Sequence, residues 1–223
     1  MRKVLIIALL IAGCVFAQEE KKSFLDGFSF SLGINSSQIK GNLEDKIFLV
    51  GQEENKQIGF VYGWQKILKN DLRVEIGIRF RGANYGYNNG LAGAHKTSIQ
   101  LNYITLNISK PYTIYKIKIL PYHKSKSKIN FPIKLAISFL VDGKYDYKKH
   151  NFNIFNNEDI SISTEIKKLN VNKFDLGIPI GIELEYEDKL SICVDYYIGH
   201  IDIFNDVKSK NHSLQYYLRY KLS

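Results

Sequence analysis

The sequence predicts an all-β fold, an eight-stranded antiparallel up-and-down β-barrel. The first observation is a strict two-residue period in 174–186, where every even-numbered residue is apolar or aromatic. Such a period is typical of a β-strand with one apolar and one polar face. The second observation is that the alternation resumes after the polar pair Glu187 and Asp188, which predicts a hairpin. The third is composition: 15 Tyr, 13 Phe and only 4 Pro in 223 residues favour strands, and a single all-β barrel commonly has this length.

The N-terminal segment 1–17 has the form of a secretory signal peptide. Arg2 and Lys3 precede an apolar run at 4–16, and the run is too short and too close to the N-terminus to be a spanning helix. We therefore expect a signal peptide at 1–17 and one barrel domain at 18–223.

A second way of processing the N-terminus stays open. Residues 11–14, IAGC, resemble the box that precedes a lipidated cysteine in bacterial lipoproteins, which would make Cys14 a lipid anchor. After ordinary cleavage Cys193 is the one remaining cysteine, so no intramolecular disulfide can form. We expect Cys193 to pack as a small residue on a strand.

Alternation of the same kind defines the other strands in order. It is sharpest in 71–82, where apolar residues alternate with charged residues and glycine. In 97–109 the apolar phase changes between Tyr103 and Ile104, and such a change usually marks a β-bulge. The eight expected strands are 23–35, 57–65, 71–82, 97–109, 129–141, 174–186, 190–199 and 214–222. The expected loops are 36–56, 83–96, 110–128, 142–172 with an outlying hairpin at 160–169, and 200–210, and the expected short turns are 66–70 and 187–188.

The polar phase of these strands combines glycine and serine with charges of both signs. Small residues beside opposite charges suit the narrow, water-poor lumen of a barrel, where carboxylates and guanidinium groups must pair. We therefore expect a structural ion network in the lumen, formed by Arg73, Glu75, Arg79, Arg81, Glu183, Glu185, Asp195 and Arg219. The alternative is a soluble barrel in which these charges face water and the apolar phase lines a cavity.

Three features favour a barrel that spans the outer membrane. The connections after the first, third, fifth and seventh strands are longer than those after the second and sixth, an asymmetry typical of outer-membrane barrels, and only the connection after the fourth strand, 110–128, breaks the pattern. Strands of about ten residues are long enough to cross a bilayer when tilted. Aromatic residues lie near strand ends on the apolar face, where they would form girdles at the lipid boundary: Trp64, Phe80, Phe131, Phe139, Tyr186, Tyr196 and Tyr220.

The partners expected for such a barrel are outer-membrane lipid, lipopolysaccharide and the barrel assembly machinery. A surface ligand or protein could also bind its extracellular loops. The formal net charge of +9 does not indicate nucleic-acid binding, because the lysines are scattered through predicted loops without an RNA-binding signature.

Two segments resemble a known family. The run FDLGIPIGIELEY, with LSICVDYYIGHIDI after the turn, resembles the penultimate hairpin of the PorT-like outer-membrane β-barrel proteins of Bacteroidetes-type bacteria, and RVEIGIRFRGANYGY resembles their third strand. LNYITLNIS is similar to the next strand, although Thr105 and Asn107 replace an acid and a proline of the family pattern. The C-terminus also departs from the family, since Leu222 and Ser223 follow Tyr220 in place of a final aromatic residue. The resemblance implies an eight-stranded membrane barrel, usually without a known activity.

Catalysis is not expected, and neither is a metal or another cofactor. His123 and Ser125 have the two-residue spacing used by lipid-modifying barrel hydrolases, but they lie in the run HKSKSK, which is typical of a solvated basic connection. The sequence therefore predicts a small, non-enzymatic integral outer-membrane barrel with a structural role or a surface-interaction role through its extracellular loops. The alternative is a soluble or lipid-anchored periplasmic barrel that binds an apolar ligand, as lipocalins do.

Overall fold

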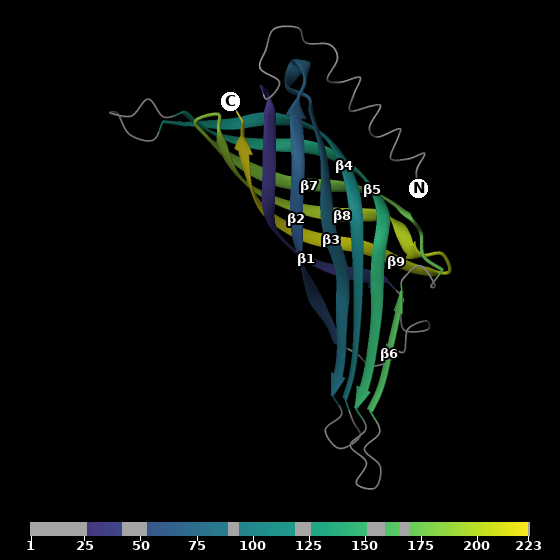
Figure 1. Cartoon of the computed structure of the whole chain (residues 1–223). Coiled ribbons are helices and arrows are strands. Elements are labelled where there is room, and N and C mark those ends of the chain that lie inside the picture. The colour runs from purple at the N-terminus through teal and green to yellow at the C-terminus, as the bar shows by residue number, and fades with distance from the viewer. Residues whose placement is uncertain are drawn as a thin grey trace.

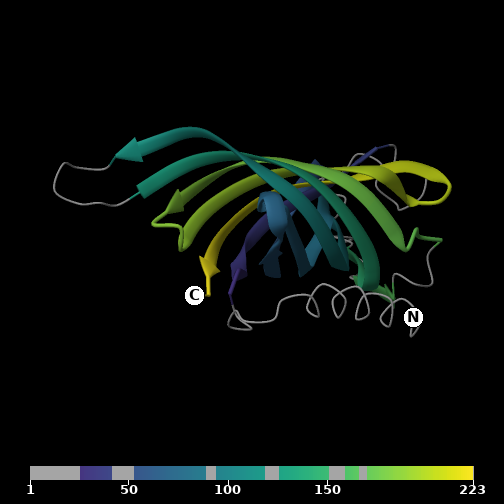
Figure 2. The ribbon, with the colours of Figure 1, turned by 90° about the horizontal axis from the view of Figure 1, so that it is seen from above.

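A computed structural model describes residues 26–41, 53–88, 94–118, 126–150, 159–165 and 170–222. Within them the strands are β1 (Phe28–Gly41), β2 (Glu53–Ile67), β3 (Arg73–Asn88), β4 (Ala94–Lys118), β5 (Lys126–His150), β6 (Asp159–Glu165), β7 (Phe174–Tyr186), β8 (Leu190–Phe204) and β9 (Val207–Lys221). Eight of them form a closed antiparallel ring in the order β1-β2-β3-β4-β5-β7-β8-β9, and β9 pairs back with β1 (Figures 1 and 2). The predicted fold class, an all-β eight-stranded antiparallel barrel, is confirmed. None of the described residues form a helix long and apolar enough to cross a membrane.

The two ends of the barrel differ. At one end, here called the terminal rim, β1 begins opposite the end of β9, and tight turns join β2 to β3 and β7 to β8. At the other end, here called the extended rim, β3, β4 and β5 reach well beyond the ring and β6 pairs with β5 (Figure 1). The predicted signal peptide at 1–17 and Cys14 lie outside the described residues.

Both tight turns of the terminal rim have two successive residues in the left-handed region. They are Asn70 and Asp71, with φ of 61° and 60°, and Glu187 and Asp188, with φ of 52° and 55°. Positive φ at both central residues characterises type I′ hairpin turns, whose twist matches that of the flanking strands. The predicted turn at 187–188 is therefore correct, and the amide of Lys189 donates to the carbonyl of Tyr186 at 3.1 Å.

Most of the loops predicted at the extended rim were wrong, because the strands continue into them. The predicted loops 36–56 and 83–96 contain the ends of β1 and β3 and the starts of β2 and β4. In the predicted loop 142–172, β5 runs on to His150 and β6 adds to its edge. The predicted loop 200–210 is reduced to Asn205 and Asp206 between β8 and β9, so the connection after the seventh strand of the ring is not a long one.

The expected outlying hairpin at 160–169 is corrected in the same way. β6 is a single strand that pairs with residues 144–150 of β5. Residues 166–169 lie outside the described part of the chain.

The expected bulge in 97–109 is also corrected, because β4 pairs with β3 in one continuous register from Arg73 opposite Ser109 to Asn88 opposite Ala94. What changes along β4 is the chemistry of its two faces. Ile99 and Leu101 point inward and are fully buried, while polar residues such as Gln100 occupy the outer face. This exchange of polar and apolar faces makes the extended strands look like loops in the sequence. A register shift does occur in the pairing of β4 with β5. Asn102 is opposite Asp142 and Tyr103 is opposite Leu140, so the extra residue lies in β5.

The segment 110–128, predicted to be an irregular connection, is largely strand. β4 continues to Lys118 and β5 starts at Lys126, and the two pair along this length with Pro111 opposite Pro132. Residues 119–125, including His123, lie outside the described residues. Lysines and proline hid the two-residue period here.

The outer surface of the ring is an apolar band. Ile178, Ile180 and Ile182 are exposed by 42%, 47% and 54%, as are the equivalent outward positions of the other strands. Strand pairing places aromatic and leucine side chains side by side at the terminal rim, in the order Tyr186, Leu190, Tyr220, Phe30 and Trp64.

Candidate functional site

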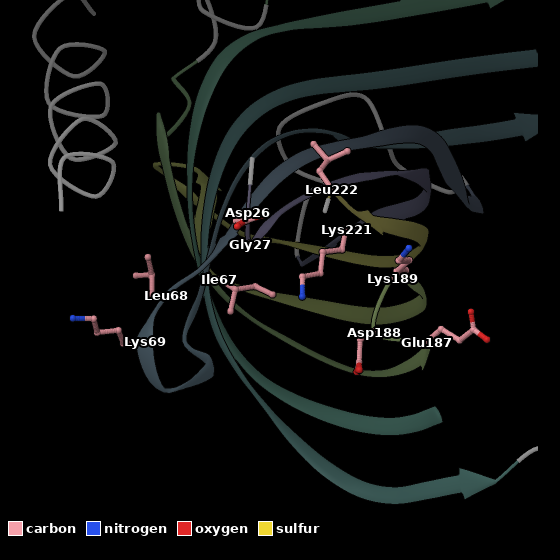
Figure 3. A pocket seen from close by; sticks show the side chains of 10 residues that line it. All are labelled: Asp26, Gly27, Ile67, Leu68, Lys69, Glu187, Asp188, Lys189, Lys221 and Leu222. Atoms are coloured by element: carbon pink, nitrogen blue, oxygen red, sulfur yellow. The ribbon is translucent and has the colours of Figure 1, made fainter. Parts of the chain in front are cut away.

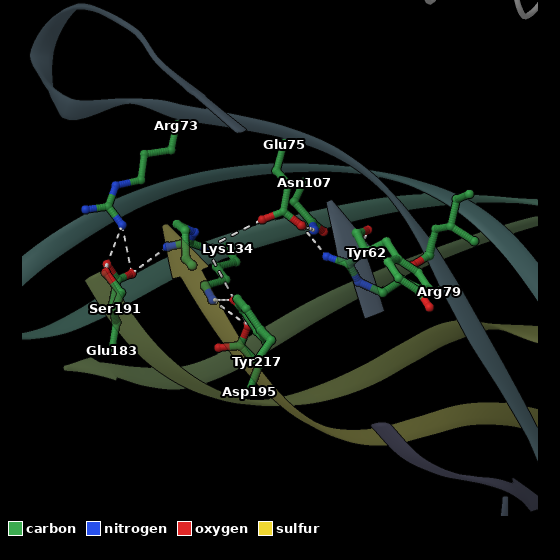
Figure 4. Close-up of polar contacts among 12 residues, drawn as sticks. Tyr62, Arg73, Glu75, Arg79, Asn107, Lys134, Glu183, Ser191, Asp195 and Tyr217 are labelled. Carbon is green, nitrogen blue, oxygen red and sulfur yellow. Dashed lines mark hydrogen bonds and ion pairs between the residues drawn. The ribbon is translucent and has the colours of Figure 1, made fainter. Parts of the chain in front are cut away.

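The interior of the barrel holds charged side chains from the polar phase of the strands. Arg79, Arg81 and Glu183 are at most 2% exposed although they come from strands with an apolar outer face. Alternation explains this, since successive residues of a strand point to opposite sides of the sheet. Figure 4 shows Arg79, Glu183 and polar side chains around them, which come from β3, β5, β7, β8 and β9.

The largest group of contacts is centred on Glu183. The carboxylate accepts from Arg73 Nη1 at 2.7 and 2.9 Å, from Arg219 Nη1 at 2.9 Å and from Ser191 Oγ at 3.0 Å. Arg219 Nη2 also forms an ion pair with Glu75 Oε2 at 3.4 Å, and Glu75 forms a second ion pair with Arg79. The result is a chain of alternating charges that connects β3, β7 and β9 across the lumen, where each charge has a partner.

Two further groups lie beside this chain. Lys134 Nζ contacts Asp195 Oδ2 at 2.5 Å and the hydroxyl of Tyr217 at 2.9 Å, and that hydroxyl also donates to Asp195 at 2.6 Å. Nearer the extended rim, Arg81 Nη1 lies 3.3 Å from Asp175 Oδ2, and its guanidinium stacks on the ring of Tyr197 at 3.7 Å. Stacking and ion pairing both stabilise this buried guanidinium.

The structure brings together six of the residues predicted for the network, namely Arg73, Glu75, Arg79, Glu183, Glu185 and Arg219. The other two, Arg81 and Asp195, lie in the separate groups and pair with Asp175 and Lys134, which the sequence reasoning missed. The signal was present, because Lys134 and Asp175 stand on the polar phase of their strands between apolar residues. With these two included, five cationic side chains face five carboxylates in the interior, and one of the carboxylates, Glu185, is only partly buried.

An apolar cluster fills the lumen beyond Arg81, at the extended rim. This rim cluster consists of Ile39, Ala83, Tyr85, Ile99, Leu101, Tyr103, Tyr145, Tyr147, Ile203 and Phe204. Tyr103 links it to the charged groups, because its hydroxyl accepts from Asn211 at 3.1 Å and its ring lies 5.1 Å from the Arg81 guanidinium. The extended strands therefore pack, together with the ends of β1 and β8, around an apolar core beyond the charged groups.

At the outer part of the extended rim, His95 Nδ1 lies 2.8 Å from the hydroxyl of Tyr147. Burial and the neighbouring ammonium group of Lys149 lower the pKa of His95 below its ordinary value. The imidazole is therefore mainly neutral at pH 7.

The terminal rim opens into a hollow of about 570 Å³ (Figure 3). Its walls carry charges of both signs. One of the wall residues, Asp188, accepts a hydrogen bond at Oδ1 from Lys128 Nζ at 2.5 Å. This hydrogen bond lowers the pKa of the Asp188 carboxyl. The hollow narrows toward Arg73 and Glu183 to a space of about 40 Å³, enough for a few water molecules at most. The open end of the barrel thus meets the ion network directly.

Gly177 tests how tightly the interior is packed. A methyl group at this position would overlap the ring of Tyr197, whose hydroxyl donates to Asp175 Oδ2 at 2.9 Å. Gly177→Ala is therefore expected to lower the free energy of unfolding by about 1–3 kcal/mol, measured by urea titration. In a Tyr197→Ala background the same substitution should cost much less, and equal costs in the two backgrounds would contradict the packing.

The described acidic side chains and Cys193 have structural contacts. Among the described residues no three His, Cys, Asp or Glu side chains form a group able to hold a metal ion. Glu183 and Glu185 both contact Arg73 instead of facing each other as an acid and base pair. Cys193 is fully buried against Val61 and Tyr217.

Models of known protein families and the curated proteins contain no match to this chain. Among solved structures it is similar to Neisserial surface protein A, NspA, with 13% identity over 88% of this chain and 98% of that one and a TM-score of 0.43. It is also similar to Ail, the attachment invasion locus protein of Yersinia pestis, with 14% identity over 87% and 98% and a TM-score of 0.43. A structure of Ail in complex with the heparin analogue sucrose octasulfate gives 16% identity over 87% and 98%, with a TM-score of 0.43. The assignment of an eight-stranded barrel rests on the strand pairing described above.

Proposed function

We propose that this chain is a small integral outer-membrane β-barrel protein without catalytic activity, which serves a structural or surface-interaction role through its extended rim. The observation that carries the proposal is the inverted distribution of side chains, with an apolar band outside a closed ring and paired charges inside. Closure matters because hydrocarbon offers no hydrogen-bond partner to an unpaired strand edge. Burying the apolar band in lipid removes it from water.

The proposal includes an orientation. The terminal rim faces the periplasm and the extended rim faces outward, since outer-membrane barrels have short periplasmic turns and longer structures on the extracellular side. The tight turns at 69–71 and 187–189 support the first assignment. The projecting strands β3 to β6 support the second.

The rival function, a soluble lipocalin-like carrier of an apolar ligand, needs the opposite distribution. In such a barrel Ile178, Ile180 and Ile182 would line a cavity, and Arg79 and Glu183 would contact water. Instead these isoleucines are about half exposed and the two charged side chains are buried. The integral membrane barrel is therefore the better supported function.

Other parts of the proposal extend further than the fold. Export by a signal peptide at 1–17, insertion by the barrel assembly machinery and contact with lipopolysaccharide follow from an outer-membrane location. Membership of the PorT-like family rests on the segments that form β3 and the β7–β8 hairpin. The absence of catalysis rests on the structural roles that Glu183 and Glu185 have in the ion network.

Fractionation of a Gram-negative host that expresses the full chain tests the proposal. We expect the protein to sediment with outer membranes, to resist extraction by high salt, and to migrate on a gel at a different apparent mass before and after heating. A peripheral protein would be released by salt, because charge screening weakens electrostatic attachment. Release by salt alone, or recovery in the soluble periplasmic fraction, would refute an integral barrel.

A further inference from the structure

A group of lysines occupies the outer face of the barrel directly beyond the apolar band. Along β9 the outward residues run from Tyr216 and Leu214 to His212 and then to Lys210 and Lys208. On the adjacent β1, Lys40 follows the same outward phase, and strand pairing sets it directly opposite Lys210. All three lysines are exposed, and they are called the lysine cluster below.

Placing Lys40 opposite Lys210 is unfavourable by itself. Directly opposed residues of an antiparallel pair have Cβ atoms about 4.5–5.5 Å apart, and like charges in that position destabilise a sheet. Lys56 on β2 is also exposed, and it lies one strand further round the same rim. Such a concentration of positive charge is stabilised when an anion binds to it.

The carboxylate nearest to the cluster in the strand register accepts a hydrogen bond from the backbone. Asp202 of β8 is opposite Lys210, but its Oδ1 accepts from the amide of Ser209 at 2.8 Å. In the part of the chain that the structure describes, none of the three cluster lysines forms an ion pair with a carboxylate. By contrast, Lys128 at the terminal rim pairs with Asp188, and Lys134 in the lumen pairs with Asp195.

The depth of the cluster indicates the kind of anion. A tilted strand advances roughly 2.5 Å per residue along the barrel axis, so Lys210 lies roughly 10 Å beyond Leu214, the apolar residue of the outer face of β9 that is nearest to the cluster. Lysine side chains bend toward the headgroup layer while their methylene stems cover apolar surface. The apolar band and the cluster are continuous, so one molecule with acyl chains and an anionic headgroup can contact both.

We propose that Lys40, Lys208 and Lys210 form a binding site for the phosphate groups of the phosphorylated glycolipid in the outer leaflet, lipid A. The inference rests on the proposed outer-membrane location and on the extended rim facing outward. The acyl chains lie on the band formed by Leu214, Tyr216 and the neighbouring residues of β1. The phosphate groups supply the negative charge that the three ammonium groups do not receive from an ion pair with a described carboxylate.

Binding of lipid A to the folded full-length barrel in neutral detergent micelles tests the site. We expect the wild-type protein to bind diphosphorylated lipid A at least tenfold more tightly than lipid A from which both phosphates have been removed. The triple variant Lys40→Gln, Lys208→Gln, Lys210→Gln should bind the diphosphorylated form about 100-fold more weakly, since each basic residue near a charged bilayer surface contributes about 1 kcal/mol. The matched control Lys69→Gln, Lys189→Gln, Lys221→Gln removes the same charge at the terminal rim and should bind like the wild type.

The outcomes separate this inference from the proposed function. Equal affinity for lipid A with and without phosphates would overturn the site, even in a protein that fractionates as an integral barrel, and this comparison needs no variant. Inorganic phosphate that binds as tightly as lipid A would show a site for free phosphate and overturn the lipid assignment. Equal losses in the two triple variants would show a general effect of net charge and overturn it too. A shift in apparent mass on heating of each variant establishes that it has folded.

Discussion

Glu183→Gln is expected to lower the free energy of unfolding of the barrel by about 3–5 kcal/mol. The carboxylate is 1% exposed and contacts both Arg73 and Arg219 within 3 Å. Without its charge, each guanidinium keeps only a longer contact, to Glu185 at 3.5 Å and to Glu75 at 3.4 Å. Two positive charges then remain in a region of low dielectric constant with incomplete compensation, which is far more costly than losing an exposed ion pair.

Urea titration of the protein in lipid vesicles measures the effect. Trp64, the one tryptophan of the chain, lies on the outer face, so its emission should report the loss of the lipid environment. The matched control is Glu185→Gln, the same chemical change two residues away. The Glu185 side chain is 15% exposed and lies 3.5 Å from Arg73, so we expect a loss below about 1 kcal/mol. Similar losses in the two variants would contradict a network centred on Glu183.

Ile180→Arg should destabilise the inserted barrel by about 2–4 kcal/mol, because it places a charge on the lipid-facing surface near the bilayer midplane. Ile180 is in the middle of β7, 47% exposed, and flanked in register by Ile133 and Tyr196. Folding into vesicles of a neutral phospholipid, followed by urea titration, gives the difference from wild type.

The cost should depend on depth. Leu190→Arg introduces the same side chain at the start of β8, among the aromatic residues of the terminal rim, and is expected to cost only about 0–1 kcal/mol. A water-exposed outer face would tolerate both substitutions equally. Equal and small effects would therefore overturn the assignment of this face to lipid.

The central part of every ring strand could be predicted from the two-residue period of the sequence. Within the apolar band the outward residues are apolar and the inward residues are polar or small. Residues 174–186 are the clearest case, and β7 has those bounds. Beyond the band the sequence predicts loops where the same strands continue. There Tyr145 and Tyr147 point into the rim cluster while Lys144 and Asp146 face outward, so the apolar residues change sides. Hydrophobic periodicity identifies strands, but it does not show which face of the sheet contacts water.

The charged interior was predicted in composition but not in partner choice. Arg73, Glu183 and Arg219 could be grouped because all belong to polar phases of strands, whereas their contacts depend on the register across β3, β7 and β9. Register is set by long-range pairing and by turn geometry, which a single sequence does not show. Lys134 was missed because it is the one charged residue on the inward phase of the central part of β5, among small and polar neighbours.

The rim cluster holds together the part of the barrel that extends beyond the apolar band. The extended strands pair with one another and pack around the rim cluster beyond the apolar band. They therefore form one packed unit and not separate loops. With the proposed orientation, a peptide epitope inserted between Asn88 and Ala94 should be bound by antibodies on intact cells.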